Sequence, residues 1–199
     1  MMSSIGACLS ALREGRLLAL PTDTYYALAC DPLNSAAMSR LRALKRPSAH
    51  RPWPLLVDRQ VDLAALGCVV TELARRLICA FWPGQVTVVV PCSGALSLAV
   101  GRKGDGAVGF RSPAGPPFLA ELLHTWRGPI TGTSANLSGQ APATTPADFD
   151  PSLGEAVACV VTAVCPGGAA STVVDATGTV TGIIREGVVP ASEIIGVLS

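Results

Sequence analysis

The amino-acid sequence predicts a single α/β domain in which helices flank a mixed β-sheet. Helical and strand patterns alternate along the first part of the chain, and several strand patterns follow one another near its end. The chain has 199 residues, of which 49% are hydrophobic and 15% are charged, so it can bury one sizeable core. The sequence contains no internal repeat, heptad pattern or linker-like stretch. Residues 1–199 are therefore expected to form one domain.

Amphipathic periodicity and terminating residues predict the helices. A first helix is expected to begin near Ile5 and to end at Gly15. A second is expected from the capping residue Asn34 through Leu44, and Pro47 prevents its continuation. Further helices are expected over residues 63–81, 118–126 and 192–198.

Short apolar runs bounded by turn residues predict the strands. The strongest of these patterns covers residues 86–90, because every side chain in it is β-branched. The other expected strands cover residues 17–20, 53–57, 107–110, 130–133, 157–161, 172–174 and 181–184. Because the late strands follow one another without helices between them, the sheet is expected to be mixed.

The charge balance and the cysteines indicate the kind of partner and the compartment. Lys and Arg number 15 against 14 Asp and Glu, so the net charge of +1 creates no long-range attraction for nucleic acid. The seven cysteines lack a Cys-x-x-Cys pair and mostly have apolar neighbours, which predicts buried thiols in a reducing compartment. The sequence shows neither a secretory signal nor the roughly 18 apolar residues of a membrane span, so a cytoplasmic location is expected.

A polar loop follows an apolar stretch in the second half of the chain. It contains Thr133, Ser134, Asn136 and Ser138, which place four hydroxyl or amide side chains within eight positions. Ser134 and Asn136 can cap the next segment, as Ser and Asn often do. One cap does not require four polar groups, so this loop is predicted to bind a ligand.

A second hydroxyl-rich segment, residues 20–28, follows the first strand pattern. Thr22, Asp23 and Thr24 can form a local Asx or ST turn, which is a common structural use of these residue types. Both polar segments directly follow apolar strand patterns. We therefore expect two strands to deliver their hydroxyl groups to one site.

Five basic residues lie between positions 40 and 51 with no acidic residue among them. Lys45 and Arg46 end the second predicted helix, where the helix dipole already favours cations. Arg51 follows in a loop that Pro47 and Pro52 stiffen. Phosphate oxygens need charge neutralisation and forked hydrogen bonds, which such cations supply. An anion site is therefore favoured over a helix cap.

Three further polar residues lie beside strand patterns. Ser171 precedes the predicted strand 172–174, after a Pro166-Gly167-Gly168 turn that lets the backbone approach closely. Arg185 follows the last strand pattern. Arg111 also follows a strand, where a lone Arg more often forms a surface ion pair than binds a ligand. These three residues are candidates whose roles the pattern alone does not assign.

Several common catalytic motifs are absent from the sequence. It has no Walker-type phosphate loop, no dinucleotide-binding fingerprint and no Gly-x-Ser-x-Gly elbow. It has only two histidines, His50 and His124, so no zinc site is expected. A site rich in hydroxyls and cations but poor in histidine suits alignment and charge stabilisation better than covalent catalysis.

Together, in this order and spacing, the motifs resemble the YrdC family of threonylcarbamoyl-AMP synthases over nearly the whole chain. The family's Pro-Thr-[Asp/Glu]-Thr-x-Tyr-Gly-Leu run matches residues 21–28 except that Ala27 replaces Gly. Its Lys-x-Arg matches Lys45, although Pro47 stands where the Arg is expected, so Arg46 or Arg51 would have to substitute. Its terminal run of apolar residues, Arg and Gly is similar to Ile-Ile-Arg-Glu-Gly here. The resemblance implies a YrdC-like twisted mixed sheet with a concave basic face.

The resemblance also implies an activity and a set of site residues. The enzyme would make L-threonylcarbamoyladenylate and pyrophosphate from ATP, L-threonine and bicarbonate, for the threonylcarbamoyladenosine (t6A) modification of tRNA. Mg²⁺ would be carried by the ATP phosphates, and other proteins of the t6A pathway would complete the transfer to tRNA. The residues implied on the nucleotide side, of which the first two are also catalytic, are Lys45, Arg46, Arg51, Ser134, Asn136 and Arg185. The residues implied around threonine are Thr24, Arg111, Thr133 and Ser171.

Two alternatives stay open at this point. A YrdC-like paralogue, or a relative of the carbamoyl-transfer domain in hydrogenase maturation proteins, would use another acceptor, and the changed Lys-x-Arg and Tyr-Ala positions hint at it. A non-catalytic module would bind tRNA or another double-stranded RNA on the concave face. The near-zero net charge weighs against this module, because phosphate contacts dominate such binding.

Overall fold

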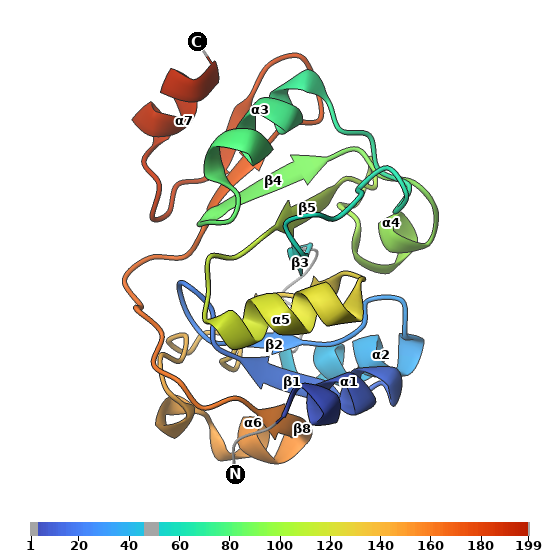
Figure 1. Ribbon diagram of the computed structural model, residues 1–199, viewed down its shortest axis with the longest axis vertical. Helices are drawn as coiled ribbons and strands as arrows, with labels where there is room; N and C mark the ends of the chain where they lie inside the picture. Colours follow the sequence, from blue (N-terminus) through green and yellow to red (C-terminus); the bar gives the residue numbers. More distant parts are fainter. Residues whose placement is uncertain (1–3, 46–51, 199) are drawn as a thin grey trace.

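The computed structural model describes residues 4–45 and 52–198. Within these residues the strands form two mixed sheets, and the larger sheet lies above the smaller one in Figure 1. The four-stranded sheet has the order β7 (Thr133–Ser134), β2 (Ala27–Ala29), β1 (Leu17–Leu20) and β8 (Val157–Val160). The six-stranded sheet has the order β10 (Gly182–Arg185), β9 (Thr172–Asp175), β4 (Val86–Val90), β5 (Val108–Arg111), β3 (Leu55–Leu56) and β6 (Ile130–Thr131).

Helices flank both sheets, which confirms the predicted α/β class. They are α1 (Ile5–Arg13), α2 (Ser35–Lys45), α3 (Glu72–Phe81), α4 (Gly94–Val100), α5 (Pro117–Trp126), α6 (Pro151–Ala156), α7 (Ala191–Leu198) and the 3₁₀ helix η1 (Pro146–Asp148). Helices α1 and α5 lie side by side over the four-stranded sheet, whereas α3 packs on β4 and against α7 (Figure 1). None of the described helices is long and apolar enough to cross a membrane.

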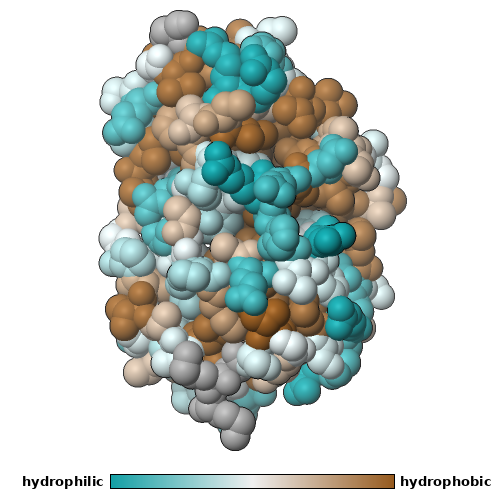
Figure 2. Space-filling model, in the orientation of Figure 1, coloured by the Kyte–Doolittle hydropathy of each residue, from teal (hydrophilic) through white to brown (hydrophobic). Residues whose placement is uncertain are grey.

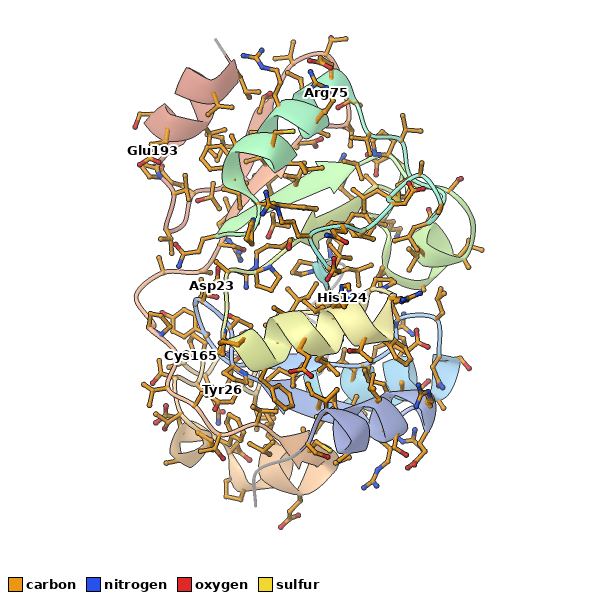
Figure 3. The ribbon with its side chains drawn as sticks, viewed as in Figure 1. Asp23, Tyr26, Arg75, His124, Cys165 and Glu193 are labelled. Atoms are coloured by element: carbon orange, nitrogen blue, oxygen red, sulfur yellow. A yellow bond between two sulfur atoms is a disulfide. The ribbon has the colours of Figure 1, made fainter. Side chains whose placement is uncertain are left out.

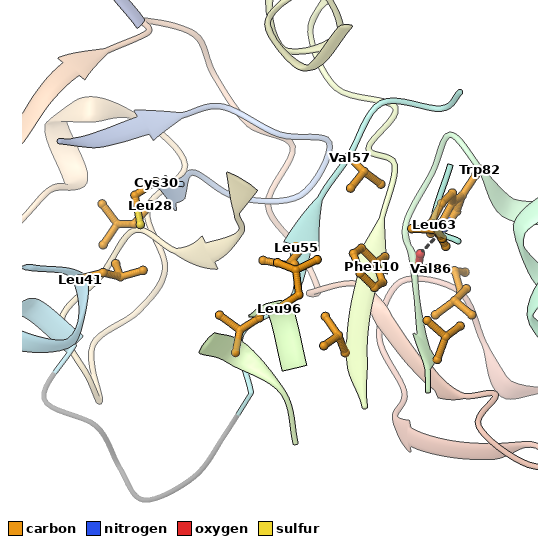
Figure 4. Packing of buried hydrophobic residues seen from close by; sticks show 14 of the residues in the cluster. Leu28, Cys30, Leu41, Leu55, Val57, Leu63, Trp82, Val86, Leu96 and Phe110 are labelled. Atoms are coloured by element: carbon orange, nitrogen blue, oxygen red, sulfur yellow. Dashed lines mark hydrogen bonds between the residues drawn. The ribbon is translucent and has the colours of Figure 1, made fainter. Parts of the chain in front are cut away.

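The larger hydrophobic cluster contains residues of both sheets (Figure 4). Leu28 of β2, Leu55 of β3 and Phe110 of β5 are fully buried in it. The indole of Trp82 packs at its edge and donates a hydrogen bond of 3.0 Å to the carbonyl oxygen of Val86. Burying one Leu or Phe side chain contributes about 1.5–3 kcal/mol to the stability of the fold. The two sheets therefore share one core, and this core fixes how they face each other.

The predicted end of the first helix and the predicted start of the second are confirmed. The Oδ1 atom of Asn34 accepts a hydrogen bond of 3.0 Å from the amide of Ala37, as expected of a helix cap. Gly15 follows α1 with a φ of 67°, a conformation that glycine adopts without a steric penalty. Strand 86–90 also has the predicted bounds.

The helix predicted over residues 63–81 is wrong in its first half, because only Glu72–Phe81 is helical. The Oδ1 atom of Asp62 accepts from the amides two and three residues onward, at 2.9 and 3.2 Å, which forms a local turn instead. Gly67 has a φ of 79°, outside the helical region. Thr71 then caps α3 through a hydrogen bond of 3.1 Å from the amide of Ala74. Local side-chain turns therefore override the apolar periodicity.

The prediction that the cysteines are all buried thiols is wrong for three of them. Cys68 and Cys92 form a disulfide, and Cys79 is exposed. The two bonded cysteines oppose each other in an antiparallel bridge, an encounter between segments 24 residues apart that the sequence does not reveal. The other four are buried, and burial raises the pKa of Cys8 to about 12 and that of Cys30 to about 11. These two thiols therefore stay protonated at neutral pH.

The strand predicted over residues 130–133 is divided between the two sheets. Its first half, β6, pairs with β3, and its second half, β7, pairs with β2. The chain crosses at Gly132, where an added Cβ would lie 2.7 Å from the Cγ atom of Leu56. Strand β2 and helices α4 and α6 were not predicted. The crossing at Gly132 brings the polar loop to the place where the sheets meet.

Candidate functional site

A cavity of about 300 Å³ lies where the two sheets meet, within the size range of small-molecule sites. Hydrophilic residues also gather across the middle of the face shown in Figure 2. From the side of the four-stranded sheet and α2, the cavity is lined by Thr22, Thr24, Tyr25, Lys45, Thr133 and Ser134. From the side of the six-stranded sheet, it is lined by Trp53, Thr87, Arg111, Ser171 and Arg185. Polar segments that are distant in the sequence therefore converge, as predicted.

The buried side chain of Lys45 reaches the cavity from the end of α2. Its ammonium group donates to the carbonyl oxygens of Ser134 and Asn136, at 2.7 and 2.8 Å, and to Oδ1 of Asn136 at 2.9 Å. Burial lowers the pKa of Lys45 to about 8. All three acceptors are neutral, so they orient the ammonium group without cancelling its charge. Lys45 is thus prepared to meet an anion.

The polar loop wraps around the end of α2 and does more than cap a segment. The hydroxyl of Ser134 donates to Oδ1 of Asn136 at 2.6 Å, and the amide nitrogen of Asn136 donates to the carbonyl of Gln140 at 2.6 Å. The hydroxyl of Ser138 donates to the carbonyl of Lys45. Asn136 is not among the residues that line the cavity. It contacts Lys45 and therefore acts on the site through that residue.

Thr22 and Thr24 form the predicted local turn and also line the cavity. Their hydroxyl oxygens lie 3.1 Å apart, and the hydroxyl of Thr22 donates to the carbonyl of Tyr25 at 2.7 Å. Both threonines are buried. The structural and functional interpretations of this segment are therefore compatible, because the turn is what presents the hydroxyl groups to the cavity.

Asp23, between these threonines, connects the loop after β1 to the six-stranded sheet. Its Oδ1 atom lies 3.0 Å from Nη2 of Arg111, and its Oδ2 atom accepts from the amide of Ala114 at 3.1 Å. Its carbonyl oxygen accepts from the side chain of Gln85 at 2.6 Å. Figure 3 shows Asp23 between the upper and lower parts of the molecule. Its polar groups therefore connect the two sheets across the cavity.

Arg111 forms a buried ion pair and not the surface pair that a lone Arg at a strand end suggested. Its side chain is 6% exposed and that of Asp23 is 10% exposed. Burial lowers the pKa of Arg111, while Asp23 raises it and Arg185 lowers it further. The Nη1 atom of Arg111 lies 3.5 Å from the hydroxyl of Thr24, at the long limit of a hydrogen bond. Arg111 therefore lies beside a residue predicted to contact threonine.

Ser171, Arg185 and Thr87 line the cavity from the side of the six-stranded sheet, opposite Lys45. The hydroxyls of Thr87 and Ser171 lie 2.9 Å apart. Arg185 donates to the carbonyl of Ser171 from Nε at 3.2 Å and from Nη2 at 2.8 Å. The backbone of Ser171 therefore sets the position of the Arg185 guanidinium.

Most of the predicted site residues meet at the cavity, and several lining residues were missed. Those that line it are Thr24, Lys45, Arg111, Thr133, Ser134, Ser171 and Arg185. Arg46 and Arg51 lie outside the described residues. The missed residues include Thr87, Tyr25 and Trp53. A signal existed for Thr87, since it alternates with the core residues Val86 and Val88 and so faces the other side of β4.

Comparisons with known proteins agree with this architecture. A model of the Sua5/YciO/YrdC family, described as "Telomere recombination", matches residues 10–187. The chain is 34% identical over 154 residues to the threonylcarbamoyl-AMP synthase of Chromohalobacter salexigens, covering 77% of this chain and 82% of that protein. It is 33% identical over 168 residues to that of Vibrio vulnificus, covering 81% and 87%.

A solved structure gives the same result. The crystal structure of P. abyssi Sua5 complexed with L-threonine superposes with a TM-score of 0.84 at 28% sequence identity. The match covers 98% of this chain and 57% of that protein, so this chain spans little more than half of the Sua5 length. The family model covers most of the chain, and the two synthases are similar to it over more than three quarters of its length. The chain therefore belongs to the Sua5/YciO/YrdC family.

Proposed function

We propose that this protein synthesises L-threonylcarbamoyl-AMP and pyrophosphate from ATP, L-threonine and bicarbonate, as a step toward t6A in tRNA. The relatives from Chromohalobacter salexigens and Vibrio vulnificus are named threonylcarbamoyl-AMP synthase, and Sua5 was crystallised with L-threonine. The observation in the molecule that carries the proposal is a single cavity that combines Lys45 with Arg111 and Arg185 among buried hydroxyl groups. Such a site suits a reaction between two anionic substrates.

The chemistry requires alignment and charge stabilisation more than proton transfer by side chains. The amino group of threonine captures bicarbonate as a carbamate with loss of water. A carbamate oxygen then attacks the α-phosphorus of ATP, which forms the mixed anhydride and releases pyrophosphate. This nucleotidyl transfer develops negative charge on phosphate oxygens, which preorganised cations stabilise. The ammonium of Lys45, oriented by neutral oxygens, is placed to do this.

The two sides of the cavity suit different substrates. The nucleotide is assigned to the side of Lys45 and Ser134, where the ammonium charge is not cancelled by its hydrogen-bond acceptors. Threonine is assigned to the side of Thr24, Arg111 and Ser171, which offers a guanidinium for the carboxylate and hydroxyl groups for the side chain. Because Arg111 is already paired with Asp23, it contributes geometry as well as charge. Two assigned subsites in one cavity would bring the carbamate to the α-phosphorus.

Mg²⁺ is expected to enter with ATP, bound to its phosphates. Among the residues that the structure describes, no group of three or more His, Cys, Asp or Glu side chains is placed to hold a metal ion. The carboxylate of Asp23 is engaged by Arg111 and Ala114. Mg²⁺ commonly binds through substrate phosphates and water with few protein ligands.

The test is pyrophosphate release from the purified chain with ATP and Mg²⁺, omitting threonine and bicarbonate in turn, with mass detection of the adenylate. Release that requires both substrates supports the proposal. Release that proceeds with another amino compound in place of threonine would indicate a paralogue with a different acceptor. No release, together with RNA binding that weakens steeply with salt, would indicate the non-catalytic module.

A further inference from the structure

The connector between β8 and β9 passes from the smaller sheet to the larger one beside the cavity. It covers residues 161–171, and it rises along the left side of Figure 1. Its last two residues, Ala170 and Ser171, line the cavity. The conformation of this connector therefore shapes the wall to which threonine is assigned.

Tyr25 holds the middle of this connector. Its hydroxyl donates to the carbonyl of Gly168 at 2.8 Å, across 143 residues of sequence. Beside it, the amide of Gly167 donates to the carbonyl of Thr24 at 2.8 Å. Gly167 and Gly168 have φ angles of 71° and 85°, which residues other than glycine rarely adopt. An added Cβ on Gly167 would lie 3.8 Å from the ring of Tyr25. The turn is thus held by two hydrogen bonds to neighbouring residues, one from the Tyr25 hydroxyl and one to the Thr24 carbonyl.

The position of this turn is transmitted to the cavity within three residues. Ser171 follows Gly168 closely, and its carbonyl accepts two hydrogen bonds from the Arg185 guanidinium. The carbonyl of Ala170 accepts from the amide of Val188 at 2.9 Å, which links the connector to the segment after β10. A displaced turn would therefore move Ser171 and Arg185 together.

General stabilisation is the simpler explanation of the Tyr25 hydroxyl, but the neighbouring Tyr26 already serves that purpose. Tyr26 is buried, and its hydroxyl lies 2.7 and 2.8 Å from the carbonyl oxygens of Val161 and Ala163, either of which can accept its single proton. The hydroxyl oxygen also accepts from the amide of Ala163 at 2.8 Å, where the connector begins. The start of the connector is thus fixed from inside the core. The bond of Tyr25 is exposed and acts farther along, beside the cavity.

We infer that Tyr25 is a positioning residue for substrate binding, which acts by holding the Gly167-Gly168 turn so that Ser171 is set for L-threonine. The role in threonine binding depends on the proposed function. The contact between Tyr25 and the connector does not depend on it. The two parts can therefore be tested separately.

The experiment compares wild type with Tyr25→Phe, which keeps the ring and removes only the hydroxyl. Hydrogen exchange of the 165–171 amides is expected to accelerate about 3- to 10-fold, as loss of one hydrogen bond predicts. The KM for L-threonine and its dissociation constant from calorimetry are expected to rise by about the same factor, with kcat little changed and a smaller rise in the KM for ATP, because Arg185 moves with Ser171. Ser10→Ala is the control, since it removes an exposed hydrogen bond of 2.8 Å within α1 and should change none of these quantities.

Unchanged exchange in Tyr25→Phe would overturn the inference, and so would faster exchange with unchanged threonine binding. If the variant loses kcat and melting temperature together without a change in KM, Tyr25 is structural and the inference is also wrong. Should wild type neither bind nor turn over threonine, the proposed function fails. The exchange measurement then decides alone whether Tyr25 holds the connector.

Discussion

The two walls of the cavity hold their cations by different means. On the side of α2, Lys45 donates to three neutral oxygens, which orient its charge and leave it available. On the side of β5, Arg111 is paired with the carboxylate of Asp23 from the facing loop, and both are nearly buried. A carboxylate neutralises the positive charge of its partner, whereas a carbonyl oxygen only orients the charged group. The comparison indicates that Lys45 is built for an anionic ligand, whereas the Arg111–Asp23 pair first joins the sheets.

The largest expected effect comes from breaking the buried pair. Asp23→Ala leaves the Arg111 guanidinium buried without its carboxylate, which should lower the free energy of unfolding by about 3–5 kcal/mol. Urea denaturation measures this loss. Glu72→Gln is the matched control, because the Glu72–Arg75 pair is 68% and 60% exposed and should contribute little to the free energy of unfolding. Equal losses in the two variants would show that Asp23 does not join the sheets.

The other wall predicts a loss of activity with little loss of stability. Lys45→Met removes the charge at similar length, and should lower kcat/KM for ATP about 100- to 1000-fold, as removal of one charge-stabilising donor does elsewhere. Its free energy of unfolding should fall less than that of Asp23→Ala, because burying the ammonium is itself costly. Steady-state kinetics with Lys103→Met, an exposed lysine, provides the control. If Lys45→Met had wild-type kinetics, the ATP phosphates would have to bind elsewhere.

The pKa of Lys45 sharpens the same comparison. Its ammonium form is lost as pH rises through about 8 in the free protein, below the ordinary value of 10.5, so ATP affinity should fall above pH 8. Between these two values the unfolded chain binds more protons, so this group's contribution to the free energy of unfolding rises with pH. Calorimetric titration of ATP from pH 7 to 9.5 measures the first effect. Lys45→Arg keeps its charge throughout and should remove the pH dependence, whatever its absolute affinity.

The smallest effect is expected from the hydroxyl pair on the six-stranded sheet. Thr87→Val preserves shape and leaves the Ser171 hydroxyl without its partner at 2.9 Å. The free energy of unfolding should fall by about 1–2 kcal/mol, and the KM for L-threonine should rise more than the KM for ATP. Thermal unfolding and kinetics measure the two quantities. An equal rise in both KM values would contradict the assignment of this wall to threonine.

Local sequence predicted the elements whose residues decide their own conformation. Strand 86–90 has the expected bounds because β-branched residues fill it and a sheet buries it. Residues 63–71 were predicted to be helical from their apolar spacing, but a turn at Asp62 and the positive φ of Gly67 prevail. Strand β2 has only three residues and exists because β1 and β7 flank it. Tertiary pairing of this kind leaves little trace in the sequence.

For the site, residue types in the sequence indicated which side chains bind a ligand, but not which side chains contact one another. Hydroxyls and cations beside strands suggested ligands, and most of them line the cavity. Tyr25 and Trp53 were missed, because aromatic residues are more typical of a core. The contact of Asp23 with Arg111, like the disulfide, joins segments that only the folded chain brings together. Such encounters follow from topology, which one sequence specifies only indirectly.

Because residues of both sheets line the cavity, a molecule that fills it becomes a bridge between them. By mass action, a ligand at about 100 times its dissociation constant adds about 2.7 kcal/mol to the stability of the folded form. For a chain of 199 residues this corresponds to a rise in melting temperature of several degrees. A thermal-shift screen of nucleotides and amino acids, singly and in pairs, would thus report which combination the cavity accepts without requiring turnover.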